Sequence, residues 1–172
     1  VEDLEGFRIR IGNSPYLKDL YRSLGCDPQP IDLQHVAAAL RDGRADGMEI
    51  TDYGAQSGRR DEVIDHVALC DIRFACFWMC FNVHAWDSLD GDLQSLIERR
   101  YEALAEPYIA AVDRSNQASR QSLRDRGLTY TNVDRSSLQR RLHDSGFFAR
   151  WRAQLGEPAW QSIEAYRTDR TA

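Results

Sequence analysis

The chain lacks a long apolar segment and an excess of positive charge. Its longest unbroken apolar run, residues 74–81, is far shorter than the roughly 20 residues that a membrane-spanning helix needs. Acidic residues number 27 against 22 Lys and Arg, which gives a net charge of -5. Proteins that bind nucleic acid through its phosphates normally carry the opposite sign. These absences exclude an integral membrane helix and argue against a nucleic-acid partner.

The start of the chain also lacks the basic and apolar segments of an export signal, because residues 1–6 include three acidic residues and no basic one. With 172 residues, of which 42% are hydrophobic, the chain can bury a core. Its length suits one ordinary domain or a large part of a two-domain protein.

The first third predicts alternating strands and helices. Residues 7–11 alternate apolar side chains with Arg8 and Arg10, which is typical of a strand that carries its arginines on one face. Ser14 followed by Pro15 predicts a helix start. Three further elements are predicted: an extended stretch at 28–31, a helix over 32–40 and a short buried strand at 45–50. This order is typical of an α/β unit with a mainly parallel sheet.

The rest of the chain predicts one long strand and one long helix. Residues 73–83 are rich in Phe, Trp and Cys, which favours a strand buried on both faces. Apolar residues at helical spacing then predict a helix over 91–127, kinked at Pro107. The remaining predictions are strands at 63–69 and 128–131, a helical region capped by Asp134, and a short helix after Pro158.

The cysteines and histidines form no familiar site. The candidate zinc ligands are Cys70, Cys76, Cys80, His66 and His84, whose spacing differs from that of common zinc sites. On a strand, residues 76 and 80 would lie roughly 13 Å apart, too far to share a metal ion. Small buried thiols are the favoured interpretation, and a disulfide from Cys26 stays open. The chain also has no G-x-S-x-G, H-E-x-x-H or P-loop motif, so no catalytic residue is predicted.

Charged residues offer two further candidates. Asp46, Glu49 and Asp52 are spaced by three but lack the calcium-loop pattern, so a structural acid and two solvated ones are favoured. Arg8 and Arg10 precede a Gly-Asn turn and a helix start, at the edge where open α/β sheets bind ligands. A guanidinium there can grip a carboxylate with two hydrogen bonds, although an exposed structural arginine is the competing interpretation.

Four segments in order carry a family resemblance: L-E-G-F-R-I-R-I-G-N-S-P at 4–15, L-G-C-D-P-Q-P at 24–30, H-V-A-A-A-L-R-D-G-R-A-D-G-M-E at 35–49 and F-N-V-H-A-W-D-S-L-D-G-D-L-Q at 81–94. They resemble the second lobe of TRAP-type solute-binding proteins, the DctP family, whose members serve tripartite ATP-independent periplasmic transporters. The resemblance is clear from residue 3 to about 110.

This resemblance implies a periplasmic-binding-protein-like α/β lobe with a mainly parallel sheet flanked by helices, a long kinked helix and C-terminal helices. It implies four segments: a second-lobe α/β unit at 1–72, a crossover strand acting as a hinge at 73–90, a helix spanning both lobes at 91–127, and a C-terminal strand and helices at 128–172. The expected location is the periplasm, with the signal peptide and first lobe outside this chain.

The resemblance also implies a receptor that binds an organic acid in an interlobe cleft and delivers it to the membrane subunits of a TRAP transporter, without enzyme activity, cofactor or metal. Arg10 matches the carboxylate clamp. The other expected ligand residues are Gly12, Asn13 and Ser14 in the adjacent loop, Leu33 at an aromatic position, Glu49 in the D-G-x-E motif, Ile50 in place of an asparagine, and Tyr53. Tyr53 or Asp52 is a candidate for the asparagine's role. The alternatives are an enzyme that uses the same cleft and a Cys/His metal or redox module.

Overall fold

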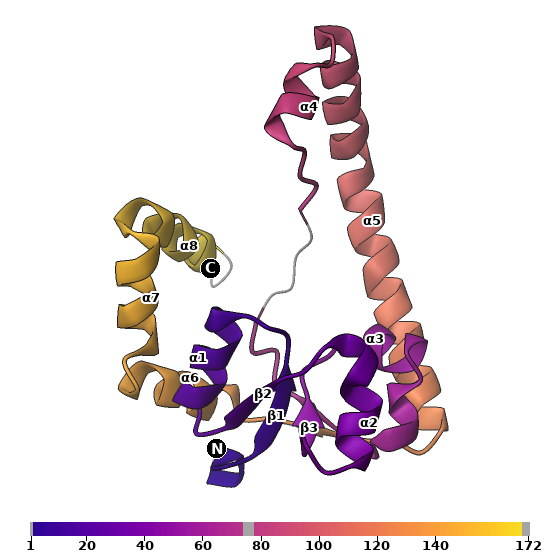
Figure 1. Cartoon of the computed structure of the whole chain (residues 1–172), viewed down its shortest axis with the longest axis vertical. Coiled ribbons are helices and arrows are strands. Elements are labelled where there is room, and N and C mark those ends of the chain that lie inside the picture. Colours follow the sequence, from indigo (N-terminus) through magenta and orange to yellow (C-terminus); the bar gives the residue numbers. More distant parts are fainter. Residues whose placement is uncertain (1, 74–77, 170–172) are drawn as a thin grey trace. The chain divides into compact units, whose positions relative to one another are not determined.

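The structure is a computed structural model that describes residues 2–73 and 78–169, and the chain in it folds as two compact units (Figure 1). The first unit holds the residues up to Glu49, Ala68–Cys70 and the chain from Asn132 onward. The second holds Ile50–Val67 and Asp71–Thr131.

A three-stranded parallel sheet forms the centre of the first unit. β1 is the middle strand, and Arg10 on it lies opposite Gln29 on one side and Met48 on the other. The alternating pattern at 7–11 therefore predicts a strand correctly, and the parallel sheet is confirmed. The expected strand at 45–50 is shorter in the structure. The strands are β1 (Arg8–Ile11), β2 (Asp27–Pro30) and β3 (Gly47–Met48).

Helix α1 (Pro15–Ser23) begins where the sequence predicts. The backbone N–H of Leu17 donates to Ser14 Oγ at 3.4 Å, and Pro15 occupies the first helical turn, where no backbone N–H is required. α1 packs against β1 and β2. The other helical segments of this half are η1 (Glu2–Leu4), η2 (Leu33–His35) and α2 (Val36–Arg41).

Three C-terminal helices complete the first unit: α6 (Arg135–Asp144), α7 (Phe147–Leu155) and α8 (Glu157–Asp169). Asp134 caps α6 as predicted, because Ser136 N–H donates to its Oδ1 at 3.0 Å. α6 and α7 both contact α1. The buried apolar side chains of this unit come from its sheet and from these helices, and include Ile9, Ile11, Leu20, Leu24, Val36, Ala39, Leu138, Leu142 and Phe147.

In the second unit, a long helix packs its C-terminal end against shorter elements. Its core consists of Ala55, Leu123 and Leu128, with Ile50, Ile64, Val67 and Tyr130 packed around them. The strands β4 and β5 pair with each other, and the chain passes between the units along both. The elements are α3 (Asp52–Ser57), η3 (Arg60–Val63), β4 (His66–Leu69), α4 (Val83–Asp87), α5 (Gly91–Asp125) and β5 (Thr129–Asn132).

The long helix is confirmed as α5, which starts at the Asp90 cap and continues through Pro107. The kink expected at Pro107 stays a prediction. None of the described helices is both long enough and apolar enough to cross a bilayer.

The long strand expected over 73–83 is wrong for the residues that the structure describes there. Residues 78–82 form neither helix nor strand, and Val83 begins α4, while 74–77 lie outside the described residues. A buried strand needs neighbours that accept its hydrogen bonds, and among the described residues both sheets are made of other segments. Several apolar side chains of this region are exposed instead: Trp78, Met79, Phe81 and Val83.

Candidate ligand-binding site

The carboxyl edge of the three-stranded sheet gathers most of the predicted ligand residues. Because the three strands are parallel, their carboxyl ends meet at one edge. Gly12, Asn13 and Ser14 follow β1, Leu33 follows β2, and Glu49 follows β3. The loop after β1 and the segments after β2 and β3 therefore form one candidate site on the first unit.

Arg10 lies on the central strand of this edge. Only 8% of the residue is exposed, and its Nε–H donates to the carbonyl of Ile31 at 2.7 Å. Its own carbonyl accepts from the backbone N–H of Glu49 at 3.4 Å. The hydrogen bond at Nε fixes the plane of the guanidinium beside the end of β2. A buried guanidinium held in one plane is well suited to bind a carboxylate with two parallel hydrogen bonds.

The start of α1 lies at the same edge, where the N–H groups of Ser14, Leu17 and Lys18 already donate within the chain. Ser14 N–H donates to the carbonyl of Gly12 at 2.8 Å, and Lys18 N–H donates to the carbonyl of Ser14 at 3.0 Å. α1 has nine residues, so its aligned peptide dipoles give its first turn a favourable potential for an anion. Arg10 and the first turn of α1 therefore both favour a negatively charged group at this edge.

Arg8, on the same strand, is already engaged by an acid of its own unit. Its Nε donates to Asp46 Oδ2 at 2.9 Å, its Nη2 donates to Asp46 Oδ1 at 2.5 Å, and its Nη1 donates to the carbonyl of Gly43. These hydrogen bonds lower the pKa of the Asp46 carboxyl and raise the pKa of Arg8. Arg8 is therefore a structural arginine, and the buried Arg10 at the carboxyl edge is the candidate for ligand recognition.

Two predicted ligand residues, Ile50 and Tyr53, belong to the second unit. The side chain of Ile50 packs on the core formed by Ala55, Leu123 and Leu128. The side chain of Tyr53 is 54% exposed. Their contact with a ligand stays a prediction.

Asp52 is the centre of a polar network in the second unit. Its Oδ2 accepts from Nε and Nη2 of Arg120 at 3.0 and 2.8 Å, and its Oδ1 accepts from the hydroxyl of Tyr130 at 2.7 Å. Burial, and after it the hydrogen bond to Asp52, raises the pKa of Tyr130. The guanidinium of Arg124 also lies over the Tyr130 ring, 4.8 Å from its centre. Sequence reasoning missed this network because no local pattern links residues so far apart in the chain.

The acids and thiols can now be placed as well. Asp46 and Asp52 are both ion-paired with arginines, the first with a side chain that is 34% exposed and the second with one that is 9% exposed. No group of three His, Cys, Asp or Glu side chains among the described residues is arranged to hold a metal ion. Three of the four cysteines are described: Cys26 and Cys80 form no disulfide, and Cys80 is exposed, while Cys76 lies outside the described part. Burial raises the pKa of the Cys26 thiol to about 11, so this thiol stays protonated at neutral pH.

Comparison with known proteins matches residues 1–144 to the family of bacterial extracellular solute-binding proteins, family 7, also called DctP. A solute-binding protein of Roseobacter denitrificans is 24% identical over 143 residues, which are 83% of this chain and 44% of that protein. A solute-binding protein of Chromohalobacter salexigens is 24% identical over 142 residues, 82% of this chain and 42% of that protein. The chain thus spans less than half the length of these relatives.

Solved structures with the same fold include two TRAP periplasmic solute-binding proteins. One, from Desulfovibrio salexigens with bound orotic acid, has a TM-score of 0.82 and 20% identity, over 96% of this chain and 54% of that one. The other, from Chromohalobacter salexigens with bound D-glucuronate, has a TM-score of 0.81 and 21% identity, over 98% of this chain and 55% of that one. With its family model matched over residues 1–144, the chain belongs to the bacterial extracellular solute-binding proteins of family 7.

Proposed function

We propose that this chain is the carboxylate-holding lobe of a periplasmic receptor, which binds an organic acid and delivers it to the membrane subunits of a TRAP transporter. The observation that carries the proposal is Arg10, a buried arginine oriented by the Ile31 carbonyl at the carboxyl edge of a parallel sheet. The ligands of the two similar structures, orotic acid and D-glucuronate, are both acids.

Arg10 would bind the carboxylate with charge-assisted hydrogen bonds. Such bonds are stronger where water is excluded, because the effective dielectric constant is lower. The first turn of α1 would add a favourable potential. Binding and release make and break no covalent bond, so this role requires neither a general base nor a cofactor.

The exposed apolar side chains of α5 support a partner lobe of the same receptor that would close over the ligand. Exposed apolar side chains follow along the first two thirds of α5: Leu93, Leu96, Tyr101, Leu104, Tyr108, Ile109 and Val112. The buried residues that α5 contributes, Ser119 and Leu123, lie in its last two turns. Exposed apolar surface of this extent marks an interaction site. We assign it to the first lobe of the receptor, which agrees with relatives more than twice as long as this match.

The second polar contact of the ligand would come from Asp52 or Tyr53, because Ile50 stands at the position of the family's asparagine. Ile50 offers an apolar side chain to its own core, and both carboxylate oxygens of Asp52 already accept hydrogen bonds. Tyr53, with an exposed side chain, is therefore the preferred candidate of the two. Leu33, which is 50% exposed, would contact the ligand's apolar surface in place of an aromatic ring.

Thermal unfolding with matched ligands tests the proposal. The protein expressed from its complete reading frame is heated with D-glucuronate, D-galacturonate or orotate, and with D-glucose as the matched neutral sugar. At least one acid should raise the melting temperature, while glucose should not. Equal shifts with glucose and glucuronate, or no shift with any organic acid in a wider panel, would contradict the carboxylate receptor. Residues 1–172 alone, with one wall of the cleft, should bind the same acid weakly or not at all.

A further inference from the structure

Helix α7 packs against α1, the helix that begins at the candidate site. α1 starts directly after Ser14, and its residues that contact α7 include Tyr16 in its first turn and Asp19 in the next. α7 begins at Phe147, beyond residue 144, where the match to the family model ends. The α7 residues of these contacts therefore lie outside the matched segment.

Trp151 contacts both of these α1 residues. Its indole ring lies 5.0 Å from the Tyr16 ring, nearly edge-on at 76°, and its Nε1–H donates to Asp19 Oδ2 at 2.8 Å. Phe147, which is 3% exposed, packs against the same tyrosine ring at 5.7 Å. Edge-to-face rings and a hydrogen bond to a carboxylate are both directional interactions. Together they restrict the rotation and the translation of the first two turns of α1.

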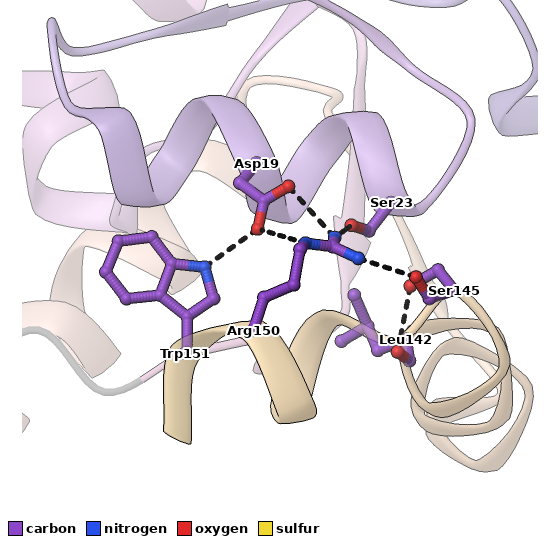
Figure 2. Close-up of polar contacts among 6 residues, drawn as sticks. All are labelled: Asp19, Ser23, Leu142, Ser145, Arg150 and Trp151. Carbon is purple, nitrogen blue, oxygen red and sulfur yellow. Dashed lines mark hydrogen bonds and ion pairs between the residues drawn. The ribbon is translucent and has the colours of Figure 1, made fainter. Parts of the chain in front are cut away.

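Arg150 completes the contact from the neighbouring position on α7. Figure 2 shows its guanidinium between α1 and the turn that precedes α7. Its Nη2 donates to Asp19 Oδ1 at 3.0 Å and to Ser23 Oγ at 2.8 Å, and its Nη1 donates to the carbonyl of Ser145 at 2.7 Å. A planar guanidinium with three partners on two elements fixes α1 against the α6–α7 turn.

We propose that Asp19, Arg150 and Trp151 are positioning residues for the ligand loop: they anchor α1 so that Ser14 and the first turn of α1 keep their place beside Arg10. The effect of this anchoring on ligand binding rests on the proposed receptor function, whereas the anchoring of α1 itself is measured separately. None of the three residues is assigned a contact with the ligand. They act through α1, whose first turn gives the site a potential that favours an anion.

The test compares two tryptophans that make the same kind of bond. Trp151→Phe removes the indole donor to Asp19 and keeps an aromatic ring against Tyr16. Trp160→Phe is the matched control, because Trp160 Nε1–H donates to Glu164 at 2.9 Å within α8. Arg150→Met and Arg152→Met form a second pair, since Arg152 instead bonds Glu157. All variants are made in the protein expressed from its complete reading frame.

Amide hydrogen exchange measured by NMR is the first readout. The N–H groups of Leu17 and Lys18 both donate to Ser14, and the N–H of Asp27 donates to Phe7 within the sheet. Trp151→Phe should raise the exchange rates of the first two about tenfold and leave that of Asp27 unchanged, whereas Trp160→Phe should change none of them. Equal acceleration at all three amides, or at none, would overturn the proposal, because the network would then support general stability or nothing.

The second readout is a titration with D-glucuronate, followed by chemical shifts. Trp151→Phe should weaken any response that depends on Arg10 several-fold more than Trp160→Phe does. Equal affinities in these two variants would also overturn the positioning role. Selective exchange in Trp151→Phe without an Arg10-dependent response to glucuronate or to other organic acids would contradict the receptor function, while the anchoring of α1 would stand.

Discussion

Replacing Asp52 with asparagine is the most informative change in the second unit, because its side chain is 9% exposed and accepts three hydrogen bonds. Asparagine keeps the volume of the side chain but removes its charge and replaces one acceptor oxygen by a donor. That donor can face the hydroxyl of Tyr130, which can accept a hydrogen bond as well as donate one, so that the remaining oxygen still accepts from Arg120. The substitution therefore leaves the guanidinium of Arg120 without its counter-charge inside the network that joins α3 to α5 and β5.

The expected cost follows from the burial of each partner. Removing the charge from a buried pair typically costs about 3–5 kcal/mol, and an unsatisfied buried polar group costs about 1–3 kcal/mol. Arg120 is 39% exposed, so water can hydrate part of its guanidinium after the substitution. We therefore expect Asp52→Asn to lower the free energy of unfolding by about 2–4 kcal/mol, which corresponds to a melting temperature lower by about 5–10 °C.

Asp46→Asn is the matched control for this experiment. Asp46 also binds an arginine through both carboxylate oxygens, but its side chain is 34% exposed and that of Arg8 is 43% exposed. Water screens such a pair, so its loss should be far less costly. Urea unfolding followed by circular dichroism gives both values. A loss for Asp52→Asn no larger than that for Asp46→Asn would refute the argument that burial gives this network its strength.

Three further changes test separate parts of the fold. Gly47→Ala would place a Cβ 2.8 Å from the Phe7 ring, so the free energy of unfolding measured in urea should fall by about 1–3 kcal/mol. Gly91→Ala is the control and should be neutral, because the space around Gly91 is open. Equal effects of the two substitutions would contradict the close approach of Gly47 to Phe7. The raised pKa of Cys26, about 11 against 9.0 for an ordinary thiol, predicts stability that is fully present below pH 9 and falls by about 2 kcal/mol by pH 10.5. Cys26→Ala should remove that part of the alkaline loss, and an unchanged pH profile would count against it. Leu104→Glu on the exposed face of α5 should reduce binding of a hydrophobic dye to residues 1–172 and leave their stability within about 0.5 kcal/mol; a large loss of stability would show that this side chain is buried.

Local patterns predict the elements around the site because local interactions determine them. The alternation at Arg8 and Arg10 and the Ser14–Pro15 pair each act within a few residues, and β1 and α1 start where these patterns place them. The choice between the two arginines needed the structure. Asp46 lies 38 residues from Arg8 along the chain, and only the parallel pairing of β1 with β3 brings them together.

The apolar stretch after residue 73 shows the opposite case. Its composition is typical of a buried strand, but a strand forms only where another strand pairs with it. Residues 78–82 find no such partner among the described residues, and Trp78 is 80% exposed. The prediction failed over this segment because composition reports the preference of a segment and carries no information about its neighbours.

The polar networks could not be predicted for a related reason. Asp52 and Tyr130 are 78 residues apart, and Asp19 and Arg150 are 131 residues apart. Acidic and basic residues are frequent along the chain, so the sequence alone offers many possible pairs. Tertiary packing selects these pairs, and it makes Asp52 a structural acid rather than a solvated one.

Calorimetric titration of two arginine variants tests the central claim most directly. The protein expressed from its complete reading frame is titrated with the organic acid that stabilises it, alongside Arg10→Ala and Arg8→Ala. Arg10→Ala should abolish binding, because the buried guanidinium is the proposed carboxylate clamp. Arg8→Ala should retain it, because Arg8 is already bound to Asp46. Full affinity in Arg10→Ala would contradict the account.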